Sequence, residues 1–175
     1  MYFLIYLTTL FTVVAANSIR FINNGNRTRN LCFYNLVKDD TLYIQFLGLP
    51  QTIEKGKELE YPLPNNFRGR FSTLLLNEEC NSAHVFGHVR FNNTAGGMTQ
   101  YTVTSTIEAG ENGSKLGISL LSAKPKTGKH EIKGCLTFPC VGADEEKDGL
   151  PAGKIPWGRA AENEMWCLID APPKR

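Results

Sequence analysis

The sequence lacks the features that would assign a function directly. It has no strong charge of either sign, because 19 Lys and Arg residues against 17 Asp and Glu residues give a formal net charge of +2. This balance excludes a general electrostatic attraction to nucleic acid or to an anionic membrane surface. No apolar run reaches the ~20 residues that a membrane-spanning helix needs. We therefore expect neither a nucleic-acid partner nor a membrane anchor.

Signatures of catalysis and metal binding are missing as well. There is no GxSxG motif for a serine nucleophile. His84 and His88 are close in sequence, but no third Cys, His or carboxylate stands at a spacing that would complete a zinc site. Glu60, Glu108 and Glu111 are carboxylates near predicted strand ends, with no further sign of acid–base work. We expect no metal and no cofactor, and favour a protein that is not an enzyme.

The first segment that is informative is MYFLIYLTTLFTVVAA, over residues 1–16. It is apolar, contains no acidic residue and ends in small residues, which is typical of a secretory signal peptide. We predict cleavage after Ala16 and a secreted, extracellular protein. Residues 17–175 would then form one domain, a length that suits a sizeable core.

Cysteines and glycosylation sequons agree with an extracellular location. In an oxidising compartment most cysteines are paired, and an odd count leaves one free or intermolecular. Cys80 is our candidate for the free thiol, so we expect a monomer or a disulfide dimer through Cys80. Cys135 and Cys140 either pair with each other or pair elsewhere. The five cysteines are Cys32, Cys80, Cys135, Cys140 and Cys167, and the three sequons begin at Asn26, Asn92 and Asn112.

Short apolar or alternating runs separated by turn residues predict an all-β fold. Successive side chains of a strand point to opposite faces. In the run over 99–107, Tyr101 and Val103 would face the core while Thr102 and Thr104 face away. The predicted strands are Ser18–Ile22, Leu31–Val37, Leu42–Leu47, Leu59–Leu63, Phe71–Leu76, Val85–Phe91, Thr99–Ile107, Leu116–Leu121 and Met165–Ile169.

Two polar segments are predicted to be loops. Residues 141–164 combine an acidic cluster with glycines and prolines, so we interpret them as a long surface loop. Residues 123–133, AKPKTGKHEIK, gather four lysines and His130. Lysine clusters attract polyanions, but no aromatic residue lies among these lysines to stack on bases. We favour a solvated hairpin loop there.

Several segments resemble thaumatin-like proteins. They are IRFINNG at the start of the first strand, PNNFRGRFSTL over residues 64–74, and the run from GHVRFNN to GENGSKLGI. The chain is most similar to small secreted fungal members of that superfamily, some labelled deoxyribonuclease-like, which share an element like GCLTFPC over 134–140.

The resemblance implies an antiparallel, disulfide-linked β-sandwich in which an early strand is joined to the last one, here by Cys32–Cys167. It also implies an acidic cleft that binds β-glucan. Thr102 and Thr104 stand in the strand where relatives carry an aspartate, and Phe67 replaces their usual tryptophan. These departures argue against a cleft of that kind and against hydrolysis borrowed from it.

The remaining candidates for ligand binding are aromatic and basic. Trp157 and Arg159 lie in the predicted long loop, where a tryptophan suits stacking on a sugar or anchoring in a partner's pocket. Phe67, Arg68 and Arg70 form a second candidate surface.

These observations favour a secreted, non-enzymatic binding protein with an effector-like role in virulence. Its target would be a cell-wall carbohydrate or a host extracellular protein. The alternatives are a secreted β-glucanase or nuclease, and a structural protein of the cell wall.

Overall fold

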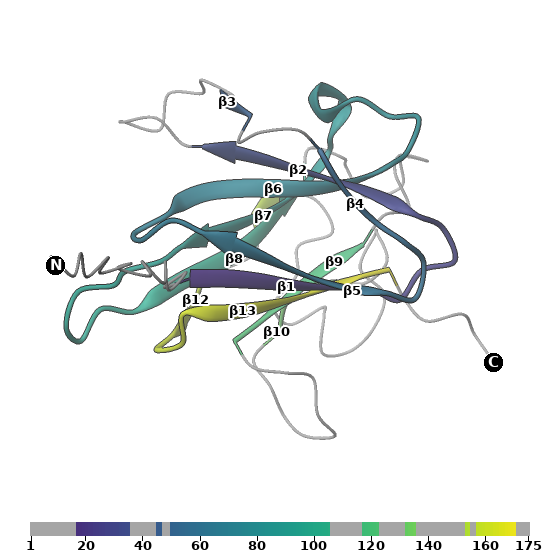
Figure 1. Cartoon of the computed structure of the whole chain (residues 1–175). Helices are drawn as coiled ribbons and strands as arrows, with labels where there is room; N and C mark the ends of the chain where they lie inside the picture. The colour runs from purple at the N-terminus through teal and green to yellow at the C-terminus, as the bar shows by residue number, and fades with distance from the viewer. Residues whose placement is uncertain are drawn as a thin grey trace, which may run out of the picture.

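The computed structural model describes residues 17–35, 45–46, 50–105, 117–122, 132–135, 153–154 and 157–170. These residues form an all-β protein of two sheets packed against each other, with one 3-10 turn and no α-helix (Figure 1). The elements are β1 (Asn17–Asn23), β2 (Arg29–Asn35), β3 (Gln45–Phe46), β4 (Gln51–Ile53), β5 (Glu58–Leu63), β6 (Arg68–Leu75), η1 (Cys80–Ser82), β7 (Val85–Arg90), β8 (Thr99–Ser105), β9 (Ile118–Leu121), β10 (Ile132–Cys135), β11 (Gly153–Lys154), β12 (Gly158–Ala160) and β13 (Glu164–Ile169).

The two sheets have five and eight strands. The first has the order β10-β9-β13-β1-β5, and the second has the order β11-β8-β7-β6-β2-β3, with β12 also paired to β8 and β4 to β2. Strands β1 and β13 are parallel, whereas the other described pairs are antiparallel. The two-sheet, all-β prediction is confirmed, but the prediction of a purely antiparallel sandwich is wrong at this pair.

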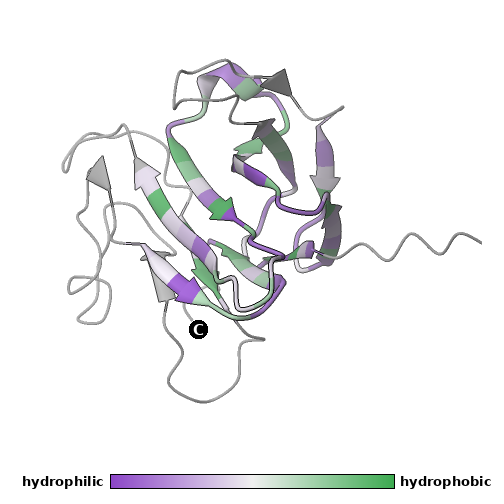
Figure 2. Ribbon diagram, turned by 90° about the vertical axis from the view of Figure 1, so that its left-hand side faces the viewer, coloured by the Kyte–Doolittle hydropathy of each residue, from purple (hydrophilic) through white to green (hydrophobic). Residues whose placement is uncertain are grey.

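Period-two alternation creates the core between the sheets. Apolar and polar residues alternate along the strands (Figure 2). Phe21 of the first sheet packs edge-on against Phe33 and Phe71 of the second, with ring centroids 5.8 and 5.0 Å apart. Burying an aromatic or aliphatic side chain of this size contributes roughly 1.5–3 kcal/mol. The faces predicted for Tyr101 and Val103 are confirmed, since both are fully buried.

The structure differs from the predicted long loop over 141–164. Within its described part, β11 and β12 pair with β8, and Gly158 and Ala160 are buried. Gly158 lies directly opposite Tyr101, whose ring occupies the space that a side chain at 158 would fill. Strand β12 has only three residues and begins with a glycine, so an alternation of apolar and polar side chains cannot be recognised in its sequence. It forms a strand because it pairs with β8.

Phe67 is a core residue, which corrects its prediction as part of a binding surface. It is 5% exposed and belongs to the main hydrophobic cluster. A Cβ at Gly69 would lie 2.3 Å from the Phe67 ring, so the glycine makes room for it. Phe71 packs in the same way over Gly87, its cross-strand partner.

The cysteine pairing also differs from the prediction. A disulfide joins Cys32 to Cys80, with Cα atoms 5.7 Å apart. The predicted Cys32–Cys167 bond and the predicted free thiol at Cys80 are therefore wrong. Cys32 points away from the core of the sandwich, whereas Cys167 of β13 is fully buried inside it as a free thiol. Burial raises the pKa of the Cys167 thiol well above its usual value.

Other predicted features fall outside the described residues: the signal peptide over 1–16, the sequon at Asn112, and Cys140. The side chain of Cys135, in β10, is also outside them. Asn17, the first residue after the predicted cleavage, starts β1 and is buried. Its Nδ2 donates to the carbonyl of Pro64 at 2.7 Å, and Asn93 Nδ2 donates to its Oδ1 at 2.8 Å.

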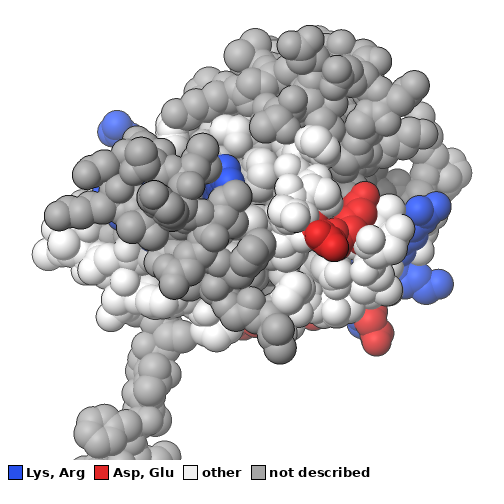
Figure 3. Space-filling model, turned by 90° about the horizontal axis from the view of Figure 1, so that it is seen from above, with Lys and Arg blue, Asp and Glu red and all other residues white. Residues whose placement is uncertain are grey.

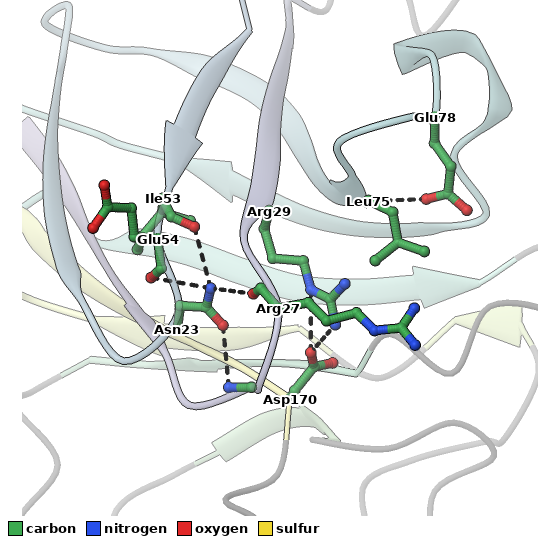
Figure 4. A network of polar contacts seen from close by, with 9 residues as sticks. Asn23, Arg27, Arg29, Ile53, Glu54, Leu75, Glu78 and Asp170 are labelled. Carbon is green, nitrogen blue, oxygen red and sulfur yellow. Dashed lines mark hydrogen bonds and ion pairs between the residues drawn. The ribbon is translucent and has the colours of Figure 1, made fainter.

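One buried ion pair connects the two sheets at the end of the sandwich where β13 stops (Figure 4). Arg29 of β2 donates through Nε and Nη2 to Asp170 Oδ2, the Nε contact being 3.2 Å. The two side chains are 5% and 14% exposed. Beside them, Asn23 Oδ1 accepts from the Gly25 amide at 3.1 Å. Asn23 Nδ2 donates to three backbone carbonyls, those of Arg27, Ile53 and Glu54.

Candidate functional site

The two sheets differ in charge. The described strands of the five-stranded sheet carry Glu58, Glu60 and Glu164 beside Arg20 and Lys133. Those of the eight-stranded sheet contain no Asp or Glu. Their basic residues are Arg29, Arg68, Arg70, Arg90, Lys154 and Arg159. Seen from the side of β2 and β3, Lys and Arg groups lie at both the left and the right of the view, and the Asp and Glu groups lie close to those on the right (Figure 3).

Cross-strand register places three arginines in one row across the eight-stranded sheet. Arg68 of β6 lies opposite Arg90 of β7, Arg90 opposite Gln100 of β8, and Gln100 opposite Arg159 of β12. The neighbouring residues along each strand, including Val89, are in the core, so this row points away from it. Arg68 and Arg159 are exposed, and Arg90 is half-buried.

A second row lies two residues further along the same strands. Arg70 is flanked by Tyr34 on one side and His88 on the other, and His88 lies opposite Thr102. Arg70 and His88 are half-buried, whereas Tyr34 and Thr102 are buried. His88 Nε2 is 2.8 Å from the hydroxyl of Thr104. The first row is therefore the more accessible one.

Two of the guanidinium groups lie over aromatic rings in cation–π contacts. The Cζ atom of Arg70 lies 4.2 Å from the ring centroid of Phe86 and 5.3 Å from that of Tyr34. The Cζ atom of Arg90 lies 4.5 Å from the ring centroid of Trp157. Each contact of this kind contributes about 0.5–2 kcal/mol and limits the movement of the arginine. Burial lowers the pKa of the Arg70 guanidinium, and the charge of Tyr34 acts in the opposite direction.

We call these outward residues the arginine face. It consists of Arg68, Arg70, His88, Arg90, Trp157 and Arg159.

The Cys32–Cys80 disulfide lies beside the arginine face, next to Tyr34, the cross-strand neighbour of Arg70. It fastens η1 over a second, smaller apolar cluster that contains Cys32, Tyr34, Leu74 and Phe86. The Tyr34 hydroxyl contacts Ser72 Oγ at 2.9 Å and donates to the carbonyl of Cys80. Burial raises the pKa of Tyr34, while the Ser72 hydrogen bond and the charge of Arg70 lower it. This cluster fixes the ring on which Arg70 rests.

The structure brings together four of the five residues predicted to bind a ligand. Arg68, Arg70, Trp157 and Arg159 all belong to the arginine face, and only Phe67 does not. His88 and Arg90 were missed as site residues. The sequence alternation over 83–91 places both on the polar face of their strand, but only the cross-strand register shows that they lie beside Arg70 and Arg68.

A separate hollow of about 480 Å³ lies over the turn between β6 and β7. Glu78, Glu79 and His84 contribute its ionisable side chains. Glu78 Oε2 accepts a hydrogen bond from the Leu75 amide at 2.7 Å, which anchors the turn. Among the described residues, no group of three or more His, Cys, Asp or Glu is arranged to hold a metal ion. His84, predicted to be without a metal role, is exposed beside this hollow.

Two sequon asparagines lie within the described residues, and both are exposed. Asn26 is in the turn between β1 and β2, and Asn92 lies just after Phe91, the residue that follows β7. Thr94 Oγ1 donates to Asn92 Oδ1 at 2.7 Å. Both are accessible to a glycan.

Comparison with models of protein families and with curated proteins found no match. Within the described part of the chain, no helix has the length and apolar character needed to cross a membrane. Among solved structures, the chain is similar to the crystal structure of the protein elicitor MoHrip2 from Magnaporthe oryzae, with a TM-score of 0.54 and 13% sequence identity. The match covers 89% of this chain and 100% of that one. At this identity the similarity shows a shared fold and no more.

Proposed function

We propose that this protein is a secreted, non-enzymatic binding protein with an effector-like role, and that it acts through the arginine face. Its targets are cell-wall carbohydrates or extracellular proteins of a host. The observation that carries the proposal is a sheet surface that presents four arginines and whose described strands contain no Asp or Glu. Exposed arginines beside a tryptophan are typical of surfaces that bind a partner.

Two further observations support secretion. The Cys32–Cys80 disulfide is typical of proteins that fold in an oxidising compartment. The structural neighbour is itself described as a protein elicitor from a fungus. We also propose that the chain is a small thaumatin-like protein, as the segments IRFINNG and PNNFRGRFSTL suggest.

A pull-down with the protein from residue 17 onward tests the proposal. Insoluble cell-wall polysaccharides and host extracellular protein are the two baits. We expect retention by at least one of them, and loss of that retention in Arg68→Gln/Arg159→Gln. The matched control is Lys55→Gln/Lys57→Gln, which removes the same charge from two exposed lysines of the β4–β5 turn. No retention by either bait would refute the proposal.

A secreted β-glucanase or nuclease is the second candidate, because Glu78, Glu79 and His84 line one hollow. Paired carboxylates, or a carboxylate with a histidine, are the groups that general acid–base hydrolysis uses. Cleavage of β-glucan or DNA by the purified protein, abolished in Glu79→Gln, would favour this candidate over the first. Retention that resists detergent extraction of the producing cell would instead favour a structural protein of the cell wall.

A further inference from the structure

The hollow over the turn between β6 and β7 has a buried lining and an exposed lining. The buried lining consists of Thr73, Leu74 and Val85. The remaining lining comes from the turn and from η1, where Glu78 is half-buried and the exposed residues are Asn77, Glu79, Asn81, Ser82 and His84. Its volume of about 480 Å³ lies in the range of small-molecule sites, roughly 300–1,000 Å³. The hollow is therefore large enough for a small ligand or for one unit of a polymer.

The buried lining contains a polar atom that lacks a partner. Thr73 is 4% exposed, and its Oγ1 has no hydrogen-bond partner among the described residues. A buried hydroxyl in this state costs free energy, and buried polar groups of native proteins are bonded in the large majority of cases. The adjacent Ser72 differs, because its Oγ contacts the Tyr34 hydroxyl at 2.9 Å. Since Thr73 lines the hollow, a ligand bound there can supply the missing partner.

Hydrogen bonds and the disulfide hold the rest of the lining in place. Glu78 Oε2 accepts from the Leu75 amide at 2.7 Å, and the Glu78 amide donates to the Leu75 carbonyl at 3.0 Å (Figure 4). Ser82 donates through its amide and its hydroxyl to the Glu79 carbonyl, at 2.9 and 2.7 Å. The disulfide fastens η1 to β2. A lining that is already ordered loses less conformational entropy when a ligand binds.

The polar groups of the hollow favour a ligand that has both a positive charge and hydroxyl groups. Glu78 and Glu79 bring two carboxylates, which accept hydrogen bonds and bind a charged donor such as a protonated amine most strongly. The amides of Asn77 and Asn81 and the hydroxyl of Ser82 both donate and accept, which suits the hydroxyl groups of a sugar. An amino sugar combines the two kinds of group.

We infer that the hollow binds an amino sugar, with the protonated amine at Glu78 and Glu79 and a hydroxyl group at Thr73. This inference goes beyond the proposed function, because the hollow contains no residue of the arginine face. No bond of the ligand is broken, which separates the inference from hydrolysis in the same hollow. A lysine side chain of a protein offers the amine alone, so it would leave the Thr73 hydroxyl without a partner.

Isothermal titration of the purified protein with a short oligomer of glucosamine tests the inference, at a mildly acidic pH that keeps the sugar amines protonated. The N-acetylated oligomer of the same length is the uncharged counterpart. We expect binding of the glucosamine oligomer, and affinity lower by about tenfold or more for the acetylated oligomer and for Glu78→Gln/Glu79→Gln, because hydrogen bonds to charged groups are the stronger ones. The matched control is Glu54→Gln/Glu58→Gln, which removes the same charge from exposed residues on either side of the β4–β5 turn. It should change the affinity by less than about twofold, as expected for charges outside the contact.

Thr73→Val distinguishes a ligand contact from a structural role. The hydroxyl has no hydrogen bond to lose within the described structure, so the variant should keep the thermal midpoint of the wild type or raise it. Its affinity for the glucosamine oligomer should fall by about two- to tenfold, as expected for the loss of one hydrogen bond. Unchanged affinity in this variant would overturn the inference.

Each other result has a defined meaning. Equal affinity for the acetylated oligomer, or unchanged affinity in Glu78→Gln/Glu79→Gln, would overturn the inference. Equally tight binding of a lysine peptide would overturn the amino sugar as the ligand class. Shortening of the oligomer, detected by mass spectrometry, would overturn the inference in favour of hydrolysis. Retention in the pull-down that is lost in Arg68→Gln/Arg159→Gln, together with no binding of the glucosamine oligomer, would overturn the inference and leave the proposed function standing.

Discussion

Breaking the buried ion pair between the two sheets should cost more stability than any other single charge change in the described structure. Arg29 and Asp170 are 5% and 14% exposed, so removal of one partner leaves a charge in a poorly solvated place. Removal of one member of a buried pair typically costs about 3–5 kcal/mol. We expect that loss for Arg29→Met and for Asp170→Asn. Asn suits position 170 because its φ is +56°, which asparagine tolerates.

The double variant Arg29→Met/Asp170→Asn distinguishes pairing from simple loss of packing. With both charges gone, no uncompensated ion is left buried, so its cost should be smaller than the sum of the single costs by about 2 kcal/mol or more. Arg29 Nη1 and Asp170 Oδ1 have no hydrogen-bond partner among the described residues, which further limits what the intact pair contributes.

Urea unfolding at neutral pH measures these differences, and thermal unfolding provides a second readout. A loss of 3–5 kcal/mol corresponds to a decrease of about 6–20 °C in the thermal midpoint for a domain of this size. Glu60→Gln is the matched control, because the Arg20–Glu60 pair is 32% and 51% exposed and should contribute at most about 1 kcal/mol. Additivity of the two single variants within about 0.5 kcal/mol would refute the coupling.

Three further predictions concern the cysteines and the strand glycines. Peptide mapping without reduction will recover Cys32 linked to Cys80, and a peptide that links Cys32 to Cys167 would contradict this pairing. Cys80→Ala will lower the free energy of unfolding by up to about 4 kcal/mol, because the bond closes a loop of 48 residues. Cys167 will resist alkylation until the protein unfolds. Because burial raises the pKa of the Cys167 thiol, the contribution of this thiol to stability is complete below the unfolded thiol pKa of about 8.5 and declines as the pH rises above that value. Cys167→Ala will reduce this decline. Fast labelling of the native thiol would argue against burial. Gly87→Ala will cost roughly 1–3 kcal/mol, since its Cβ would lie 2.4 Å from the Phe71 ring, and Phe71→Leu in the same chain will recover part of the loss; a silent Gly87→Ala would show that the ring can move away.

The sequence was sufficient to predict the long strands. Their side chains alternate with a period of two, and Tyr101 and Val103 of β8 face the core as predicted. Strands β4, β10, β11 and β12 were missed. They have two to four residues, too few for alternation to be visible, and they are strands because a neighbour supplies their hydrogen bonds.

The sequence predicted most residues of the arginine face, but it did not predict how the fold brings them together. Arg68, Arg70, Trp157 and Arg159 stood out as basic and aromatic residues in polar segments, but the register that aligns β6 with β12 depends on tertiary pairing. The prediction of the disulfide was wrong for the same reason, because the pairing of cysteines also depends on tertiary structure. Cys32 and Cys167 lie in different sheets, and their side chains belong to different hydrophobic clusters. The spacing of the two cysteines in the sequence does not show this. Phe67 was misassigned because the space above Gly69 is visible only in the fold.

A nuclear magnetic resonance titration of the labelled protein with soluble oligomers of the cell-wall carbohydrate, or with the host protein, that retains it in the pull-down tests the central claim most directly. The account predicts that the amide shifts of β6, β7, β8 and β12 around Arg68, Arg90 and Arg159 change with increasing ligand, while those of β1, β5 and β13 do not. Shifts confined to the five-stranded sheet, or to the hollow around Glu79 and His84, would contradict it.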